Sequence, residues 1–173
     1  TVTGTAANTC TNTATGTIPM NPRPTVTATS FTVCQGGSAT ITAGGASSYS
    51  WNTGVTTAGL TINPVSATTT YTVTGTDANT CTNTATGTIP MLARPTVTAT
   101  SFTVCEGSSA TITAGGASTY VWNTGVTTAG LTINPVTATT TYTVTGTAAN
   151  TCTNTATGTI TMNTRPTVTA TSF

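Results

Sequence analysis

The chain has 173 residues with only five charged side chains and a formal net charge of +1, and it contains neither histidine nor lysine. This composition provides no basic surface for nucleic acid or anionic lipid, and no apolar run is long enough for a membrane-spanning helix. Ordinary globular chains are about a quarter charged. Here Thr, Val and Ile dominate, and β-branched residues of this kind favour half-buried strands.

The sequence repeats itself with a period of 71 residues. Three cysteines show the period: Cys10, Cys81 and Cys152. We predict two full repeats at residues 24–94 and 95–165. Residues 1–23 match the C-terminal part of a truncated repeat, and residues 166–173 match the first strand of the next one. The chain is therefore expected to be part of a longer array of small autonomous β-domains.

Alternation of apolar or small residues with threonine predicts about seven short strands in each repeat. In the first full repeat they are expected near residues 25–29, 38–43, 48–52, 55–57, 59–63, 69–76 and 82–91. Glycine pairs and Asn-containing turns separate them, and no segment has helical periodicity. Seven antiparallel strands with such frequent turns predict an all-β fold, a β-sandwich.

Aromatic residues are predicted to fill the space between the two sheets. Trp51 and its equivalent Trp122 lie on the third strand, where a large side chain would reach the core. Tyr71 and Tyr142 begin the sixth strand, where a tyrosine corner lies in sandwiches of this type. An alternative role for the tryptophans is a carbohydrate-binding platform. The core position is favoured because Tyr49 shares the face of Trp51.

The cysteines occur as two in each repeat, which favours disulfides over buried thiols in a secreted domain. The predicted pairs within the repeats are Cys34–Cys81 and Cys105–Cys152. Cys10 belongs to the truncated repeat. It is predicted to bond to the cysteine that stands 47 residues before it in an adjoining segment, as Cys34 stands before Cys81. A zinc site is excluded because the chain has no histidine and no CxxC pair.

The sequence offers no residues for acid–base or metal chemistry. General acid–base catalysis needs a group that titrates near neutrality, and the chain has no histidine or lysine. Its two acids, Asp77 and Glu106, each occur in only one of the two repeats, so neither can be the basis of a repeated site. Calcium loops need clustered carboxylates, which are missing here. We predict no catalytic, cofactor-binding or metal-binding residues, and no enzyme activity.

Several short motifs occur in the same order in both repeats, and in the first they are Cys-x-Gly at 34–36, Tyr-x-Trp at 49–51, Thr-Thr-Tyr-Thr-Val at 69–73 and the cysteine at 81. Together they resemble the Ig-like (PKD-like) tandem repeats of giant secreted Bacteroidetes cell-surface proteins, which include gliding-motility adhesins and proteins sorted by type IX secretion. The resemblance implies tandem immunoglobulin-like sandwiches, an extracellular location and a role in a stalk or fibre. It implies no catalytic residues.

The expected function is therefore that of a structural repeat region in an extracellular fibre or surface-adhesin stalk, polymeric or part of a much longer chain. The expected partners are neighbouring repeats or further copies of the chain, with surface glycans as additional ligands. Nucleic-acid binding and membrane insertion are not expected. The alternative is a binding module for glycans or ice, because Thr-x-Thr rows such as 72–74 and 84–86 resemble the threonine ladders of ice-binding proteins.

Overall fold

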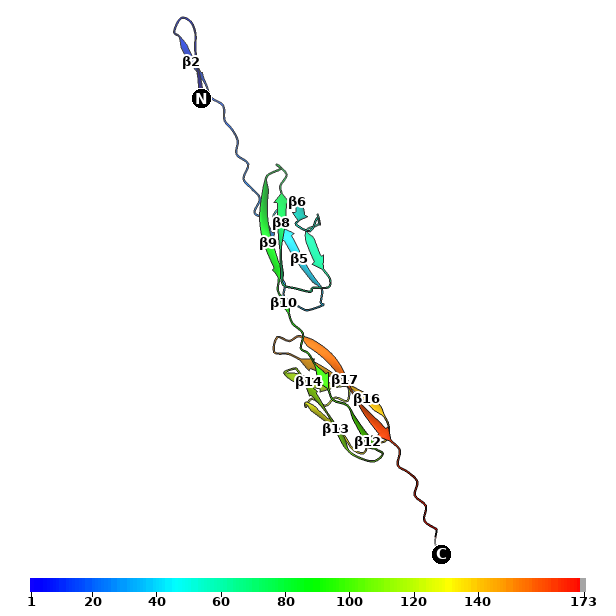
Figure 1. Ribbon diagram of the computed structural model, residues 1–173. Helices are drawn as coiled ribbons and strands as arrows, with labels where there is room; N and C mark the ends of the chain where they lie inside the picture. Colours follow the sequence, from blue (N-terminus) through cyan, green and yellow to red (C-terminus); the bar gives the residue numbers. More distant parts are fainter. Residues whose placement is uncertain (172–173) are drawn as a thin grey trace. The chain divides into compact units, whose positions relative to one another are not determined.

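The structure is a computed structural model that describes residues 1–171, and these residues form strands and turns without any helix (Figure 1). The chain divides into two compact units. The first comprises residues 1–30, 40–61 and 70–88, and the second comprises 31–39, 62–69 and the chain from 89 onward. Three segments of the predicted first repeat, 31–39, 62–69 and 89–94, thus belong to the second unit. The predicted repeat limits at 24–94 and 95–165 stay a prediction.

The second repeat contains two facing sheets. One sheet has the order β11-β13-β15 and the other β12-β17-β16-β14 (Figure 1). Their strands are β11 (Thr98–Ala99), β12 (Phe102–Cys105), β13 (Ala110–Gly115), β14 (Thr119–Trp122), β15 (Gly130–Ile133), β16 (Thr140–Thr147) and β17 (Thr153–Asn163). All pairings are antiparallel except that of β12 with β17, which is parallel. Two mainly antiparallel sheets in this order form an immunoglobulin-like sandwich, as predicted.

The first repeat has the same strand order with one interruption. Its sheets are β3-β5-β7, β6-β8-β9 and the parallel pair β10-β4. Their strands are β3 (Thr27–Ala28), β4 (Val33–Cys34), β5 (Ala39–Gly44), β6 (Ser48–Trp51), β7 (Gly59–Ile62), β8 (Thr69–Thr76), β9 (Thr82–Ile89) and β10 (Met91–Leu92). Pro90 separates β9 from β10, whereas Thr161 at the equivalent position continues β17. Proline interrupts the ladder because it has no N–H to donate.

The core lies between the sheets and follows the predicted alternation. In β13 the residues Ala110, Ile112 and Ala114 are buried, while the threonines between them are exposed. Trp122 is 1% exposed, and its Nε1 donates a hydrogen bond to the carbonyl of Thr128 at 3.0 Å. Burial of the indole therefore leaves its N–H satisfied.

One glycine allows close packing in this core. A Cβ on Gly146 would lie 2.6 Å from Cγ2 of Val97, so Val97 packs directly on the backbone of β16. Gly75 in the first repeat has the same relation to Val26. Val26 and Val97, which directly precede β3 and β11, therefore each pack against a strand that has no side chain at that point.

The prediction of a strand at residues 55–57 was wrong. These residues form a loop that folds back on Trp51. The amide of Trp51 donates to the carbonyl of Val55 at 2.8 Å, and its indole donates to the carbonyl of Thr57 at 3.0 Å. The two carbonyls are therefore bonded to one tryptophan instead of a neighbouring strand. The edge strands β4 and β12 were not predicted.

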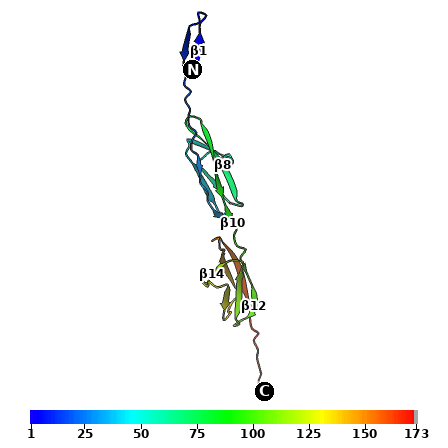
Figure 2. The same cartoon turned by 90° about the vertical axis from the view of Figure 1, so that its left-hand side faces the viewer.

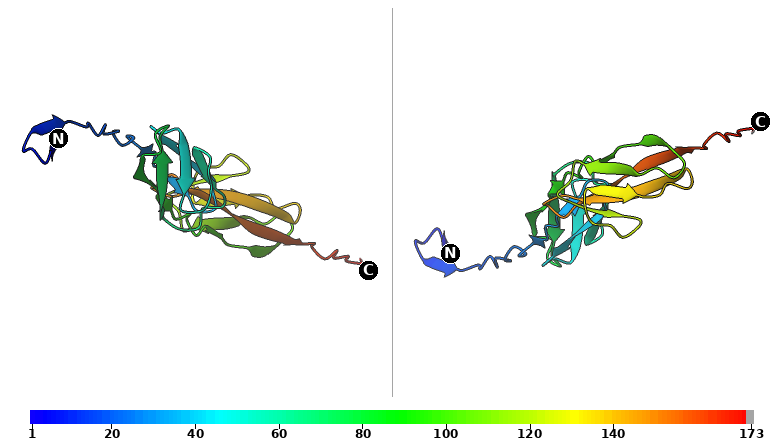
Figure 3. Two further views of the ribbon diagram at one scale, coloured as in Figure 1. Left: turned by 90° about the horizontal axis from the view of Figure 1, so that it is seen from above. Right: turned by 90° about the horizontal axis from the view of Figure 1, so that it is seen from below.

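The two ends of the described chain lack a sandwich around them. Strands β1 (Val2–Thr5) and β2 (Thr11–Ala14) form an antiparallel hairpin in which every residue is exposed (Figure 2). Residues 164–171 leave β17 as an extended segment outside any strand (Figure 3). The last two residues of the predicted 166–173 strand, 172 and 173, lie outside the described residues.

Candidate functional site: a disulfide across the repeats

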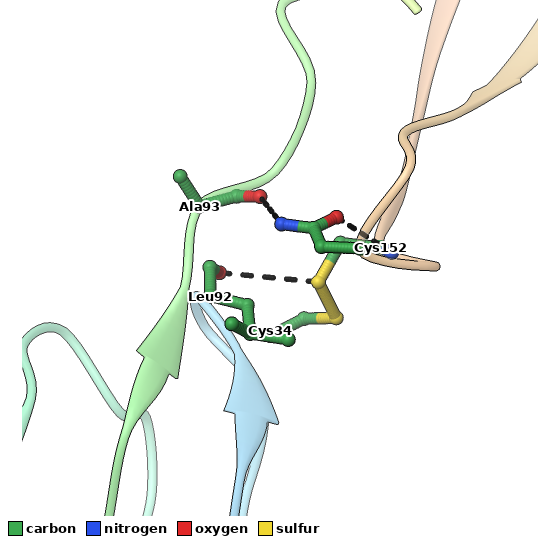
Figure 4. The surroundings of a disulfide bond; sticks show 5 residues. Cys34, Leu92, Ala93 and Cys152 are labelled. Atoms are coloured by element: carbon green, nitrogen blue, oxygen red, sulfur yellow. Dashed lines mark hydrogen bonds between the residues drawn. A yellow bond between two sulfur atoms is a disulfide. The ribbon is translucent and has the colours of Figure 1, made fainter. Parts of the chain in front are cut away.

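A disulfide joins Cys34 to Cys152, with a Cα–Cα distance of 5.7 Å and a sequence separation of 118 residues (Figure 4). This Cα–Cα distance is usual for a disulfide. Cys34 ends strand β4 of the first repeat, and Cys152 immediately precedes strand β17 of the second. Both cysteines belong to the second compact unit. The bond therefore connects the two sequence repeats to each other.

This pairing corrects the prediction that each repeat closes its own disulfide. Within the second repeat, Cys105 lies beside Asn163 in the parallel ladder, at the end of β17. Cys152 lies at the start of β17, which is 11 residues long. A strand of that length spans roughly 35 Å, whereas bonded cysteines need Cα atoms within about 7 Å. The two cysteines of one repeat thus lie at opposite ends of the sandwich and cannot bond.

Strand β4 fixes the position of Cys34. In the parallel pair of β4 and β10, Cys34 lies opposite Leu92. The amide of the next residue, Gln35, donates to the carbonyl of Leu92 at 2.8 Å. The amide of Gly37 donates back to the carbonyl of Cys34 at 2.9 Å. The backbone on both sides of the cysteine is therefore held by hydrogen bonds in addition to the disulfide.

A tight turn at residues 148–152 positions the other cysteine. The amide of Ala148 donates to the carbonyl of Cys152 at 2.9 Å, and the amide of Thr151 donates to the carbonyl of Ala148 at 3.0 Å. Thr151 has a φ of 68°, in the left-handed region that a β-branched residue rarely adopts. The equivalent Thr9 and Thr80 also have positive φ. Strained backbone of this kind tends to mark functional positions.

Residues 92 and 93 lie beside the disulfide (Figure 4). The side-chain amide of Asn150 donates to the carbonyl of Ala93 at 3.0 Å, and its oxygen accepts the amide of Cys152 at 3.1 Å. The carbonyl of Leu92 lies 3.9 Å from Sγ of Cys152. This is a packing contact, because a disulfide sulfur carries no hydrogen. The linking segment is thus bonded to both sides of the disulfide.

The other predicted site residues lie as follows. Cys10, Cys81 and Cys105 are thiols, and Cys10 and Cys105 are exposed. The core tryptophans Trp51 and Trp122 are 2% and 1% exposed. Tyr71 and Tyr142 are half-buried, and Tyr142 packs against the core of the second repeat. A different tyrosine bonds back to the main chain: the Tyr120 hydroxyl donates to the carbonyl of Ala117 and accepts its amide.

Within residues 1–171, there is no group of three or more His, Cys, Asp or Glu side chains that could hold a metal ion. The same residues contain no pocket. They also contain no helix with the length and apolar character needed to cross a bilayer. The disulfide and the segment around it are therefore the candidate site in this part of the chain.

No protein-family model matches the chain. No curated protein sequence matches it either. Similar solved structures include the N-terminal Ig1-2 module of the Drosophila receptor protein tyrosine phosphatase DLAR, which is 12% identical with a TM-score of 0.35 and covers 82% of this chain and 100% of that chain. An I-band fragment of titin is 13% identical with a TM-score of 0.43, covering 84% and 67%. Fibronectin(III)-like modules of Clostridium thermocellum CbhA are 12% identical with a TM-score of 0.35, covering 80% and 94%.

The strand order given above, and not these resemblances, defines each repeat as an immunoglobulin-like β-sandwich. The chain is therefore a tandem array of immunoglobulin-like sandwiches in which a disulfide links one repeat to the next.

Proposed function

We propose that this chain is the structural repeat region of an extracellular fibre or surface-adhesin stalk, of the kind found on Bacteroidetes cells. The observation that carries this proposal is the disulfide from Cys34 to Cys152. Structural disulfides persist in oxidising compartments such as the cell exterior. A bond between consecutive repeats, rather than within each one, suits a protein whose task is to stay connected under tension.

The disulfide changes the path that a pulling force takes. Without it, tension applied at the two ends passes through every residue and can unravel each sandwich in turn. With it, tension reaching Cys34 crosses directly to Cys152, and the 118-residue separation between them is bypassed. Trp122 lies inside the bypassed part, whereas β17, which contributes Ile160 to the same core, follows Cys152 and still carries the load. The bond therefore limits how far such a stalk can lengthen under tension.

The uncharged surface also suits a fibre. The outer face of β16 and β17 carries threonine opposite threonine, with Thr143 opposite Thr157 and Thr145 opposite Thr155. Hydroxyls of such pairs bond to one another: Thr141 and Thr159 are 3.0 Å apart. The edge strands of this sheet are β12 and β14, and neither contains the lysine or aspartate that protects an edge against lateral pairing. Neighbouring chains could therefore associate along these edges without charge repulsion.

The same threonine rows favour a second candidate, a binding surface for ice or glycans. Cross-strand rows of hydroxyls at strand spacing are the observation behind it. Buried tryptophans make poor sugar platforms, so a glycan would have to bind the threonine face. Thermal hysteresis of the purified chain would support the ice-binding version, and a glycan array would test the other. Neither reading accounts for the bond between repeats.

Electron microscopy of the native protein tests the fibre proposal. Antibody labelling of intact cells should mark thin filaments on the surface. Alkylation before lysis should leave Cys34 and Cys152 unmodified, because both are already in the disulfide. Detection of the protein only after lysis, with both cysteines alkylated, would overturn the proposal.

A further inference from the structure

We propose that Asn150 is a positioning residue for the disulfide between Cys34 and Cys152. Its side chain holds the 148–152 turn against residues 92–93 and thereby keeps the sulfur of Cys152 beside that of Cys34. All of these residues belong to the second compact unit. The inference concerns how the disulfide forms and how it resists reduction, so it holds whether or not the chain is part of a fibre.

A short sequence motif places this asparagine. Ala-Asn-Thr-Cys occurs at 149–152 and again at 78–81. The φ of 68° at Thr151 bends the backbone, and the side-chain oxygen of Asn150 accepts the amide of Cys152, two residues further on, at 3.1 Å. A side-chain amide also carries two N–H donors. The turn therefore fixes the orientation of the side chain and leaves its donors for a partner outside the turn.

That partner is Ala93, which is 57 residues away in the sequence. The side-chain nitrogen of Asn150 donates to the carbonyl of Ala93 at 3.0 Å (Figure 4). Ala93 directly follows Leu92, and Leu92 lies opposite Cys34 in the pair of β4 and β10. This hydrogen bond, which we call the Asn150 clamp, therefore joins the same two segments as the disulfide. It involves no sulfur, so it can also form in the reduced protein.

The first repeat shows which part of this arrangement the turn itself requires. Asp77 stands at the position equivalent to Ala148, and its carboxylate accepts the amides of Asn79 and Cys81, each at 2.8 Å. This turn is thus closed by an acceptor at its first residue instead of its third. A carboxylate accepts hydrogen bonds but cannot donate them. Closing the turn and donating to a neighbouring segment are therefore separable tasks.

The clamp also controls access to the disulfide. Cys152 is 1% exposed, and its Sγ lies 3.9 Å from the carbonyl of Leu92. Cys34 is half-buried. A thiolate that reduces a disulfide must reach one of its two sulfurs. The sulfur of Cys152 stays covered while the turn is held on residues 92–93, so loss of the clamp should speed reduction.

Two links that close the same gap support each other. Once one of them has formed, the other loses less conformational entropy when it forms. This coupling is reciprocal, so the clamp stabilises the disulfide as much as the disulfide stabilises the clamp. The net contribution of a neutral hydrogen bond corresponds to a factor of roughly 2–10 in an equilibrium constant. After reduction, the clamp should keep the two thiols close enough for the bond to form again.

The test is the equilibrium of the full chain with glutathione. Two protein thiols and one oxidised glutathione give one protein disulfide and two molecules of reduced glutathione. Thiols are trapped by rapid alkylation, and peptide mapping gives the fraction of chains in which Cys34 is bonded to Cys152. Asn150→Ala should lower the equilibrium constant roughly 2- to 10-fold and speed reduction by a similar factor. Asn79→Ala is the matched control, the same change in the same motif, and should alter neither.

A second pair of variants separates the clamp from closure of the turn. Ala148→Asp supplies the acceptor that Asp77 supplies in the first repeat, and alone it should leave the equilibrium constant unchanged. Combined with Asn150→Ala, it should close the turn without restoring the disulfide equilibrium. Asn150→Asp keeps the oxygen and loses the donor. It should match Asn150→Ala and provides the measurement if the alanine variant does not fold, which circular dichroism would show.

Three results would overturn the proposal. One is an equilibrium constant and a reduction rate that do not change in Asn150→Ala. Another is full recovery by Ala148→Asp, which would mean that Asn150 serves only to close its own turn. The last is an equal effect of Asn79→Ala, which would indicate a general loss of stability. Each of these leaves the fibre proposal untouched, because that proposal depends on filaments seen on cells.

Discussion

Pulling the protein from its two ends should show that the disulfide conceals most of its length. The bond bypasses a sequence separation of 118 residues. A fully extended chain spans at most about 3.3–3.6 Å per residue, so reduction should release roughly 390–425 Å of additional contour length. Oxidised protein should extend only through the residues before Cys34 and after Cys152. The variant Cys34→Ser should extend fully without reductant.

Optical tweezers with handles on the two ends, used before and after adding a phosphine reductant, measure this length directly. The alternative pairing provides the contrast. Two bonds within the repeats, Cys34–Cys81 and Cys105–Cys152, would each bypass 47 residues. Together they would conceal roughly 310–340 Å and leave the chain between Cys81 and Cys105 extensible. A release in that range, or no release at all, would refute the load path inferred here.

Three further predictions concern stability, measured by urea unfolding. Trp122→Ala should lower the free energy of unfolding by about 3–5 kcal/mol, because it empties the centre of the core; a change below about 1 kcal/mol would show that the indole is not packed there. Thr151→Gly should raise it by roughly 1 kcal/mol by relieving the positive φ, and a loss of stability would contradict the strain. Gly116→Ala should cost more than Gly125→Ala: φ is 84° and 87°, yet only at Gly116 would a Cβ collide with the carbonyl of Thr96. Equal costs would argue against the collision.

The strands that the sequence predicts well are those whose pattern is local. In β5, β8 and β9 the alternation of threonine with Ala, Ile, Val or Gly extends over six or eight residues, and the inward residues are the buried ones. Strand β4 has only two residues and its hydrogen bonds are set by a partner far along the chain, residues 91–92. A strand of that kind leaves no periodic pattern. The sequence pattern at 55–57 resembles a strand, but these residues form a loop. The carbonyl of Thr57 accepts a hydrogen bond from the indole of Trp51, and that contact is not visible in the pattern.

The number of cysteines in each repeat predicts that disulfides form, but it does not predict which cysteines pair. Two cysteines in each repeat predict a disulfide, but they do not reveal which end of the sandwich each one occupies. That depends on the parallel register that places Cys105 beside Asn163, a long strand away from Cys152. Parallel pairing of a short edge strand has no local sequence signal. The long strand predicted at 82–91 is the one sequence feature that bears on the pairing. Cys81 directly precedes this strand, and it therefore cannot approach Cys34, which lies beside Leu92 at the other end.

Cleavage at methionine gives a decisive test of the disulfide that joins consecutive repeats. Cyanogen bromide cuts after Met20, Met91 and Met162, so Cys34 and Cys152 fall on the separate fragments 21–91 and 92–162. The acid used for cleavage also suppresses disulfide exchange, because exchange requires a thiolate. Oxidised monomer should yield these fragments as one linked species that reductant separates. Fragments that already migrate separately without reductant would mean that no bond crosses from one repeat to the next.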